Sequence, residues 1–179
     1  MNQLSFTSPK GREYVIRDIQ PQDTDLLVDL FYHLTPETIY RRFHTTIDPQ
    51  TVPLEHIRQV AGQLARIDPD CDVALLALHQ DQAVGVARFH RIQGTTDAES
   101  AIVVRDDYQR EGLGTHLLEL LRARAQEKGV THLIALVLAQ NNPITQVVRQ
   151  SGLKSKWRFE QGESYLEVDI TSPEVPAAD

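Results

Sequence analysis

A glycine-containing segment near the middle of the chain has the residue types of a phosphate-binding loop. It comprises Gln109, Arg110, Glu111, Gly112, Leu113, Gly114 and Thr115. The segment follows an apolar run at 98–104, and a helical apolar pattern begins where it ends. Unpaired N–H groups at a helix N-terminus bind anions, and glycine leaves those amides accessible. The segment therefore predicts a phosphate or pyrophosphate site, with close packing of the glycines as the alternative.

The spacing of the segment excludes two common phosphate-binding loops. A P-loop has lysine and then serine or threonine after its second glycine, whereas Thr115 and His116 follow Gly114. A dinucleotide-binding loop needs a third small residue where Leu117 stands. It also needs an acidic residue at the end of the next strand, where residues 139–141 are Ala-Gln-Asn.

Hydrophobic periodicity predicts the elements that position this segment. The predicted strands are Tyr14–Ile19, Asp72–His79, Ala83–His90, Ala98–Val104, Thr131–Leu138, Lys156–Glu160 and Ser164–Ile170. The predicted helices begin at Pro21, at Pro36 after the N-cap Thr35, at Pro53, at Thr115 and at Ile144. This order indicates an α/β (α+β) fold. We expect a mixed, mostly antiparallel sheet flanked by helices, with one strand–glycine loop–helix–strand crossover.

Length and composition define the broad class of protein. The 179 residues suit one domain with its own apolar core. We expect a flexible leader at 1–12, a single domain at 13–170 and a flexible tail at 171–179. The formal net charge of −7 disfavours a nucleic-acid partner, because an acidic surface repels phosphate backbones.

Other features of the sequence concern compartment and metal binding. No apolar window approaches the ~20 residues that cross a bilayer, and no secretory signal begins the chain. The one cysteine, Cys71, fits a reducing compartment. We therefore expect a cytoplasmic protein without a membrane partner. The seven histidines show no paired ligand spacing, so no metal site is expected.

The glycine segment resembles the signature of the GNAT superfamily of N-acetyltransferases, which use acetyl-coenzyme A (acetyl-CoA). Their Gln/Arg-x-x-Gly-x-Gly/Ala motif is matched by Gln109, Gly112 and Gly114. A later Asn…Gly-Phe segment of the family is matched by Asn141 and Gly152, with leucine in place of phenylalanine. The segments 34–43 and 98–107 are similar to the acetyltransferase domain of bacterial protein-lysine acetyltransferases. The likeness extends over most of the chain, from about residue 14 to residue 170.

The resemblance implies where acetyl-CoA binds. The implied contact residues are Ile102, Val103, Val104, Gln109, Arg110, Glu111, Gly112, Leu113, Gly114, Thr115 and Asn141. The amides of 110–115 would hold the pyrophosphate. The pantetheine arm would pair with the main chain of 102–104, where the central strands separate.

The resemblance also implies direct attack by a primary amine, from a protein lysine or a small cationic molecule, in a ternary complex. A lysine ammonium has a pKa near 10.4, so a base must accept its proton. Glu99 matches the family's proposed general base, although a solvated strand-start carboxylate would look the same. A backbone N–H near Val103 would meet the oxyanion. Val148 stands where many members of the family have a tyrosine that protonates the departing thiolate. In this chain the thiolate would then take its proton from solvent.

Two other classes of function stay open at this point. A non-catalytic coenzyme A-binding regulatory module would keep the glycines without needing Glu99, and a plain interaction domain would leave the loop vacant. A homodimer is compatible with either class. Arg41 and Arg42 could contact an acidic group, but a solvated helix face is the simpler interpretation. Trp157 and Phe159 alternate in a predicted strand, and we expect them in the sheet core.

Overall fold

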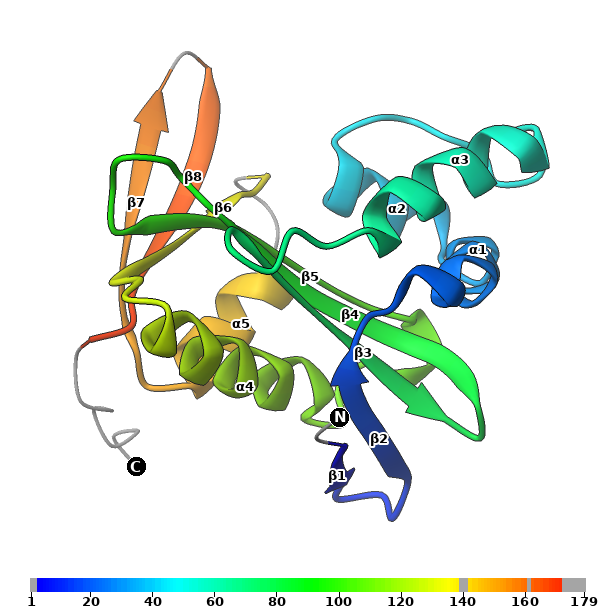
Figure 1. Cartoon of the computed structure of the whole chain (residues 1–179), viewed down its shortest axis with the longest axis horizontal. Coiled ribbons are helices and arrows are strands. Elements are labelled where there is room, and N and C mark those ends of the chain that lie inside the picture. Colours follow the sequence, from blue (N-terminus) through cyan, green and yellow to red (C-terminus); the bar gives the residue numbers. More distant parts are fainter. Residues whose placement is uncertain (1–2, 139–141, 161, 172–179) are drawn as a thin grey trace.

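The computed structural model describes residues 3–138, 142–160 and 162–171. Its centre is an eight-stranded sheet with helices on both faces (Figure 1). The strand order is β1-β2-β3-β4-β5-β6-β8-β7, and β5 and β6 form the one parallel pair among the described strands. The predicted mixed, mostly antiparallel sheet with a single crossover is confirmed. None of the helices in the described ranges is long and apolar enough to cross a membrane.

The elements follow the predicted order. The strands are β1 (Leu4–Thr7), β2 (Glu13–Asp18), β3 (Asp72–His79), β4 (Gln82–Arg91), β5 (Asp97–Val104), β6 (His132–Leu136), β7 (Lys154–Glu160) and β8 (Glu163–Asp169). The helices are η1 (Pro21–Asp23), α1 (Thr24–Tyr32), α2 (Pro36–Phe43), α3 (Leu54–Ala65), η2 (Asp106–Tyr108), α4 (Leu113–Glu127) and α5 (Asn142–Gln150). The predicted cap of α2 is present, because Thr35 Oγ1 accepts a hydrogen bond from the Thr38 N–H at 3.2 Å.

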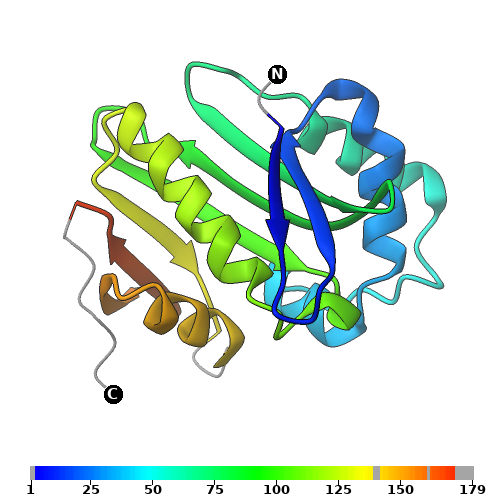
Figure 2. The same cartoon turned by 90° about the horizontal axis from the view of Figure 1, so that it is seen from below.

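The start of the chain differs from the expected flexible leader. Residues Leu4–Thr7 form β1, which pairs with β2 as an antiparallel hairpin. Phe6 on this hairpin stacks on His116 of α4, with ring centroids 4.4 Å apart. The hairpin lies beside α4 in Figure 2. The expected tail lies outside the described residues from 172 onward.

Each face of the sheet has its own apolar core. On one face α4 packs against β3, β4 and β5, with Leu117, Leu121, Phe89 and Leu133 almost fully buried. On the other face α1 packs on β4 and α2 on β5 (Figure 1). Because side chains alternate along a strand, β5 presents Ala98 to the α4 face and Glu99 to the α1–α3 face.

The edge strand β7 corrects one expectation of the sequence. All seven of its residues are exposed, and the rings of Trp157 and Phe159 stack 6.4 Å apart at the surface. The prediction that these two side chains belong to the sheet core is therefore wrong. The strand lies at the end of the sheet, where no further strand covers it within the described chain.

Candidate active site

The two central strands separate immediately after they begin to pair. β5 and β6 are in register only from Asp97↔His132 to Glu99↔Ile134. Two main-chain hydrogen bonds show to which neighbouring strand the N–H and C=O groups of β5 point. The Asp97 carbonyl accepts from the Ile92 N–H at 2.9 Å on the β4 side, and the Thr96 carbonyl accepts from the Thr131 N–H at 2.7 Å on the β6 side. Because the N–H and C=O groups of successive residues point to opposite sides of a strand, those of even-numbered residues of β5 point towards β6.

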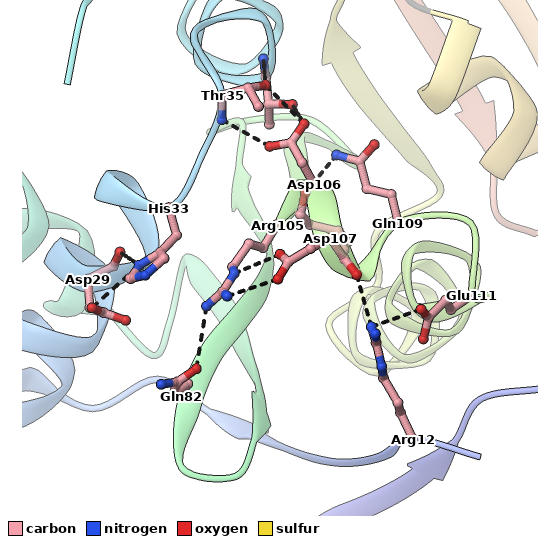
Figure 3. A network of polar contacts seen from close by, with 12 residues as sticks. Arg12, Asp29, His33, Thr35, Gln82, Arg105, Asp106, Asp107, Gln109 and Glu111 are labelled. Atoms are coloured by element: carbon pink, nitrogen blue, oxygen red, sulfur yellow. Dashed lines mark hydrogen bonds and ion pairs between the residues drawn. The ribbon is translucent and has the colours of Figure 1, made fainter. Parts of the chain in front are cut away.

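This alternation places the main chain of Ile102 and Val104 in the gap between the strands. Val103 is paired with Val86 of β4 and its N–H points to that strand. The expected oxyanion donor near Val103 therefore moves to its neighbour Val104. The carbonyl of Val104 is occupied, because Gln109 Nε2 donates to it at 2.9 Å. The Gln109 side chain thus folds the loop back onto the end of β5 (Figure 3).

Six consecutive amides precede the first hydrogen-bonded turn of α4. Within the described residues, none of the N–H groups from 110 to 115 donates a hydrogen bond, and the His116 N–H is the first to do so, to Gly112 O at 3.0 Å. Arg110 and Gly112 have positive φ angles of 58° and 80°. Such left-handed turns direct successive N–H groups into one concavity that suits an anion. The residues present therefore fit the pyrophosphate of coenzyme A.

The two glycines differ in what surrounds them. A Cβ on Gly114 would lie 3.3 Å from Val147 Cγ2 of α5, which is tighter than ordinary van der Waals contact. A Cβ on Gly112 would meet nothing closer than Phe6 Cζ at 3.7 Å, but its positive φ strains any other residue. Gly114 therefore serves helix packing, which is the alternative that the sequence left open for these glycines.

The Glu111 carboxylate points away from the loop and into the protein. Its side chain is 1% exposed and accepts hydrogen bonds from Tyr14 Oη at 2.9 Å, Arg12 Nη1 at 2.9 Å, Lys10 Nζ at 3.2 Å and Ser8 Oγ at 3.3 Å (Figure 3 shows the Arg12 contact). These donors all come from the β1–β2 hairpin. Burial alone would raise the pKa of Glu111, but these donors and cations outweigh it and lower the pKa below its ordinary value. Glu111 thereby ties the hairpin to the loop and leaves only its amide for a ligand.

Replacing Glu111 by glutamine should lower the free energy of unfolding by about 1–3 kcal/mol at pH 7, because it weakens several charge-assisted hydrogen bonds. A depressed carboxyl pKa contributes stability above the ordinary value of 4.5, and this contribution is lost as the pH falls below it. The difference between wild type and variant should therefore shrink at acid pH. Urea unfolding at several pH values measures it, with the exposed Glu13→Gln as control. A difference that does not depend on pH would contradict the argument.

Asp106 connects the loop to the opposite face of the sheet. Its carboxylate accepts hydrogen bonds from the Thr35 N–H at 3.0 Å, Thr35 Oγ1 at 2.9 Å and Thr38 Oγ1 at 2.7 Å (Figure 3). All three donors belong to the N-terminal turn of α2. Asp106 therefore fixes α2 relative to the end of β5.

Glu99 is the unpaired carboxylate of the α1–α3 face. It is exposed and forms no hydrogen bond or ion pair with the described residues. It lies in one row with Ile134 and Glu167, because Glu99 pairs with Ile134 and Ile134 pairs with Glu167. In contrast, Glu167 contacts Lys156 Nζ at 2.9 Å. Of the two carboxylates in this row, Glu99 is thus the one without a hydrogen-bond or ion-pair partner among the described residues.

A cavity of about 220 Å³ lies next to this row. Its lining residues are His132, Lys154, Ser155, Lys156, Glu167 and Asp169. His132 Nδ1 lies 3.1 Å from Asp97 Oδ1, and its Nε2 lies 3.9 Å from Glu167 Oε1. The part of the sheet formed by β6, β8 and β7 therefore has a hollow lined with charged groups, and Glu167 belongs to this lining.

Arg42 does not lie on a solvated helix face, contrary to the expectation from the sequence. It follows the buried residues Thr38 and Ile39 by four and three positions, so it belongs to the inward face of α2. Its neighbour Arg41 does bind Glu37 on the outside, at 2.5 Å. Burial, and then repulsion from Arg88, lower the pKa of Arg42 to about 10, and the Glu99 charge opposes this shift.

The remaining predicted site residues do not add a proton donor. Val148 is 4% exposed and packs in the core between the sheet and α4, so it has no role in proton transfer. Tyr165 Oη donates to Glu163 at 2.5 Å, and Tyr108 is buried against Arg12. Asn141 lies outside the described residues.

Comparison with known proteins identifies the family of this chain. The family model described as Acetyltransferase (GNAT) family matches residues 31–152, so the chain belongs to the GNAT acetyltransferases. Among curated proteins it is 29% identical over 170 residues to acetyltransferase Pat of Mycolicibacterium smegmatis. That match covers 94% of this chain but 48% of the relative, so the chain spans about half the length of Pat.

Solved structures show the same relationship. The GNAT domain of S. lividans PAT superposes with a TM-score of 0.82 at 26% identity, covering 93% of this chain and 96% of that one. PaiA N-acetyltransferase from Thermoplasma acidophilum, solved in complex with coenzyme A, has a TM-score of 0.62 at 15% identity, covering 87% of this chain and 98% of that one. The second likeness shows the fold alone.

Proposed function

We propose that this chain transfers the acetyl group of acetyl-CoA to a primary amine, of a protein lysine or a small molecule, by direct attack in a ternary complex. The observation that carries the proposal is the row of six unpaired amides at 110–115, next to the gap where β5 and β6 part. In this proposal the amides bind the pyrophosphate and the main chain of Ile102 pairs with the pantetheine. The Val104 N–H faces the oxyanion, and Glu99 takes the amine proton.

The two faces of the sheet support a division between the substrates. Ile102 and Val104 pack against the α4 core, whereas Glu99 points to the α1–α3 face. Acetyl-CoA would therefore enter from the α4 side and the amine from the other side, so that they meet in the gap. This is the geometry that direct transfer needs, because both reactants must be held at once.

Release of the coenzyme A thiol tests the proposal. We expect steady, amine-dependent thiol release when the protein is mixed with acetyl-CoA and a panel of lysine peptides and small amines. Isothermal titration with coenzyme A in parallel separates the alternatives. Binding without release for any amine would favour the non-catalytic module, and the absence of binding would remove both.

A further inference from the structure

Two arginines of the α1–α3 face lie beside Glu99. Arg88 of β4 is directly opposite Ala101, which is two residues from Glu99 on the same face of β5. Side chains in such diagonal positions are about 7–8 Å apart, which long side chains can span. Arg42 belongs to the last turn of α2, and this helix packs on β5. Two guanidinium groups and one carboxylate are therefore gathered within the length of a small molecule.

Among the described residues these groups form no hydrogen bond or ion pair with one another, although the charge of Glu99 acts on both arginines and that of Asp72 acts on Arg88. Arg42 lies over the Phe43 ring at 5.0 Å and donates no hydrogen bond to any described residue. Arg88 has a single hydrogen bond, a long one to Leu64 O at 3.4 Å. Glu99 likewise forms no ion pair within the described part of the chain. Both arginine side chains are partly buried. Because removing a cation from water without a partner is costly, inward-facing arginines that lack an ion-pair partner among the described residues support a bound anion.

We propose that Arg42 and Arg88 bind a carboxylate of the acceptor while Glu99 receives its amine. The acceptor class is then a primary amine that also carries a carboxylate, either as a free amino acid or as a lysine beside an acidic residue. Arginine suits this task because its planar N–H groups match a carboxylate. A polyamine would instead bring a second cation to the two arginines. The inference rests on the proposed acetyl transfer and narrows the class of its acceptor to amines that carry a carboxylate.

Matched acceptors test the role of the carboxylate. 4-Aminobutyrate and propylamine differ only by a carboxylate in place of a hydrogen, as do 6-aminohexanoate and pentylamine. We expect kcat/KM to be about 10- to 100-fold higher for one or both aminoalkanoates than for their amines, the usual effect of one or two charge-assisted hydrogen bonds. A second arm compares the blocked peptides Glu-Lys-Glu and Gln-Lys-Gln. A preference in the first arm identifies a free amino acid, and a preference in the second identifies a peptide.

Variants assign the effect to the arginines. In Arg42→Gln the preference for the carboxylate, taken as the ratio of kcat/KM within each acceptor pair, should fall to about twofold or less, and a change in the overall rate cancels in this ratio. Arg41→Gln is the matched control on the outer face of α2 and should keep the preference. Arg42→Lys keeps the charge and should retain part of the preference, so a poorly folded glutamine variant does not end the test.

Binding of product analogues separates this inference from the proposed function. Titration of the wild type with 6-acetamidohexanoate and with N-pentylacetamide needs no turnover. Tighter binding of the carboxylate, lost in Arg42→Gln, would support the anion site even if no amine were acetylated. Equal kcat/KM within every acceptor pair, together with equal binding of the two analogues, would overturn the inference and leave acetyl transfer itself intact.

Discussion

Replacing Glu99 by glutamine should lower the turnover of acetyl transfer by about 10²- to 10⁴-fold at pH 7, the usual contribution of general acid–base catalysis. Glutamine keeps the shape of the side chain but cannot accept the proton of the attacking amine. The affinity for acetyl-CoA should change little, because the expected cofactor contacts are on the other face of the sheet. Steady-state kinetics with acetyl-CoA and a saturating amine measure the turnover, and titration measures the affinity.

The pH profile and a second carboxylate provide the controls for this experiment. The deficit of Glu99→Gln should shrink as the pH approaches the pKa of the free amine near 10.4, because more of the acceptor is then neutral. Glu167→Gln removes a carboxylate from the same row of the sheet, one that is held by Lys156, and should cost much less turnover. Wild-type activity in Glu99→Gln at pH 7, or a larger loss in Glu167→Gln, would remove Glu99 from the mechanism.

Replacing Gly114 by valine should weaken acetyl-CoA binding by about 10- to 100-fold, the equivalent of one or two lost charge-assisted hydrogen bonds. The new side chain would press on Val147 Cγ2 of α5 and displace the first turn of α4, whose amides are expected to hold the pyrophosphate. Titration with acetyl-CoA, after thermal unfolding has shown that the variant is folded, measures the loss. A folded variant with wild-type affinity would contradict the assignment of the loop.

The packing role of Gly114 requires a compensating variant. The new Cβ would lie 3.3 Å from Val147 Cγ2, and Val147→Ala removes that atom. If the side chain at position 114 blocks the anion directly, the double variant should regain stability but not affinity. If the first turn of α4 is displaced instead, Val147→Ala should restore part of both. Alanine at position 114 is a poorer test, because the family motif accepts alanine there.

Features that depend on neighbours along the chain could be predicted from the sequence. The cap of α2 at Thr35, the loop after β5 and the helix that begins beside Gly112 are set by residue types a few positions apart. The alternation of apolar residues likewise places Glu99 and Ala98 on opposite faces of β5. The face of β5 that carries Glu99 and the loop at the start of α4 were therefore predictable as local patterns, whereas the role proposed for Glu99 came from the resemblance to the GNAT family.

Features that depend on which segments meet were decided only by the tertiary structure. The strand that contains Phe6 is held against α4, where Phe6 stacks on His116. Glu111 is buried because the hairpin supplies four hydrogen-bond donors from residues about one hundred positions away. Arg42 faces inward because α2 packs on β5, whereas Trp157 is exposed because β7 ends the sheet. Periodicity reports which residues share a face of an element but not what covers that face. Burial, and with it the charge balance around Glu99, follows from strand order and helix docking.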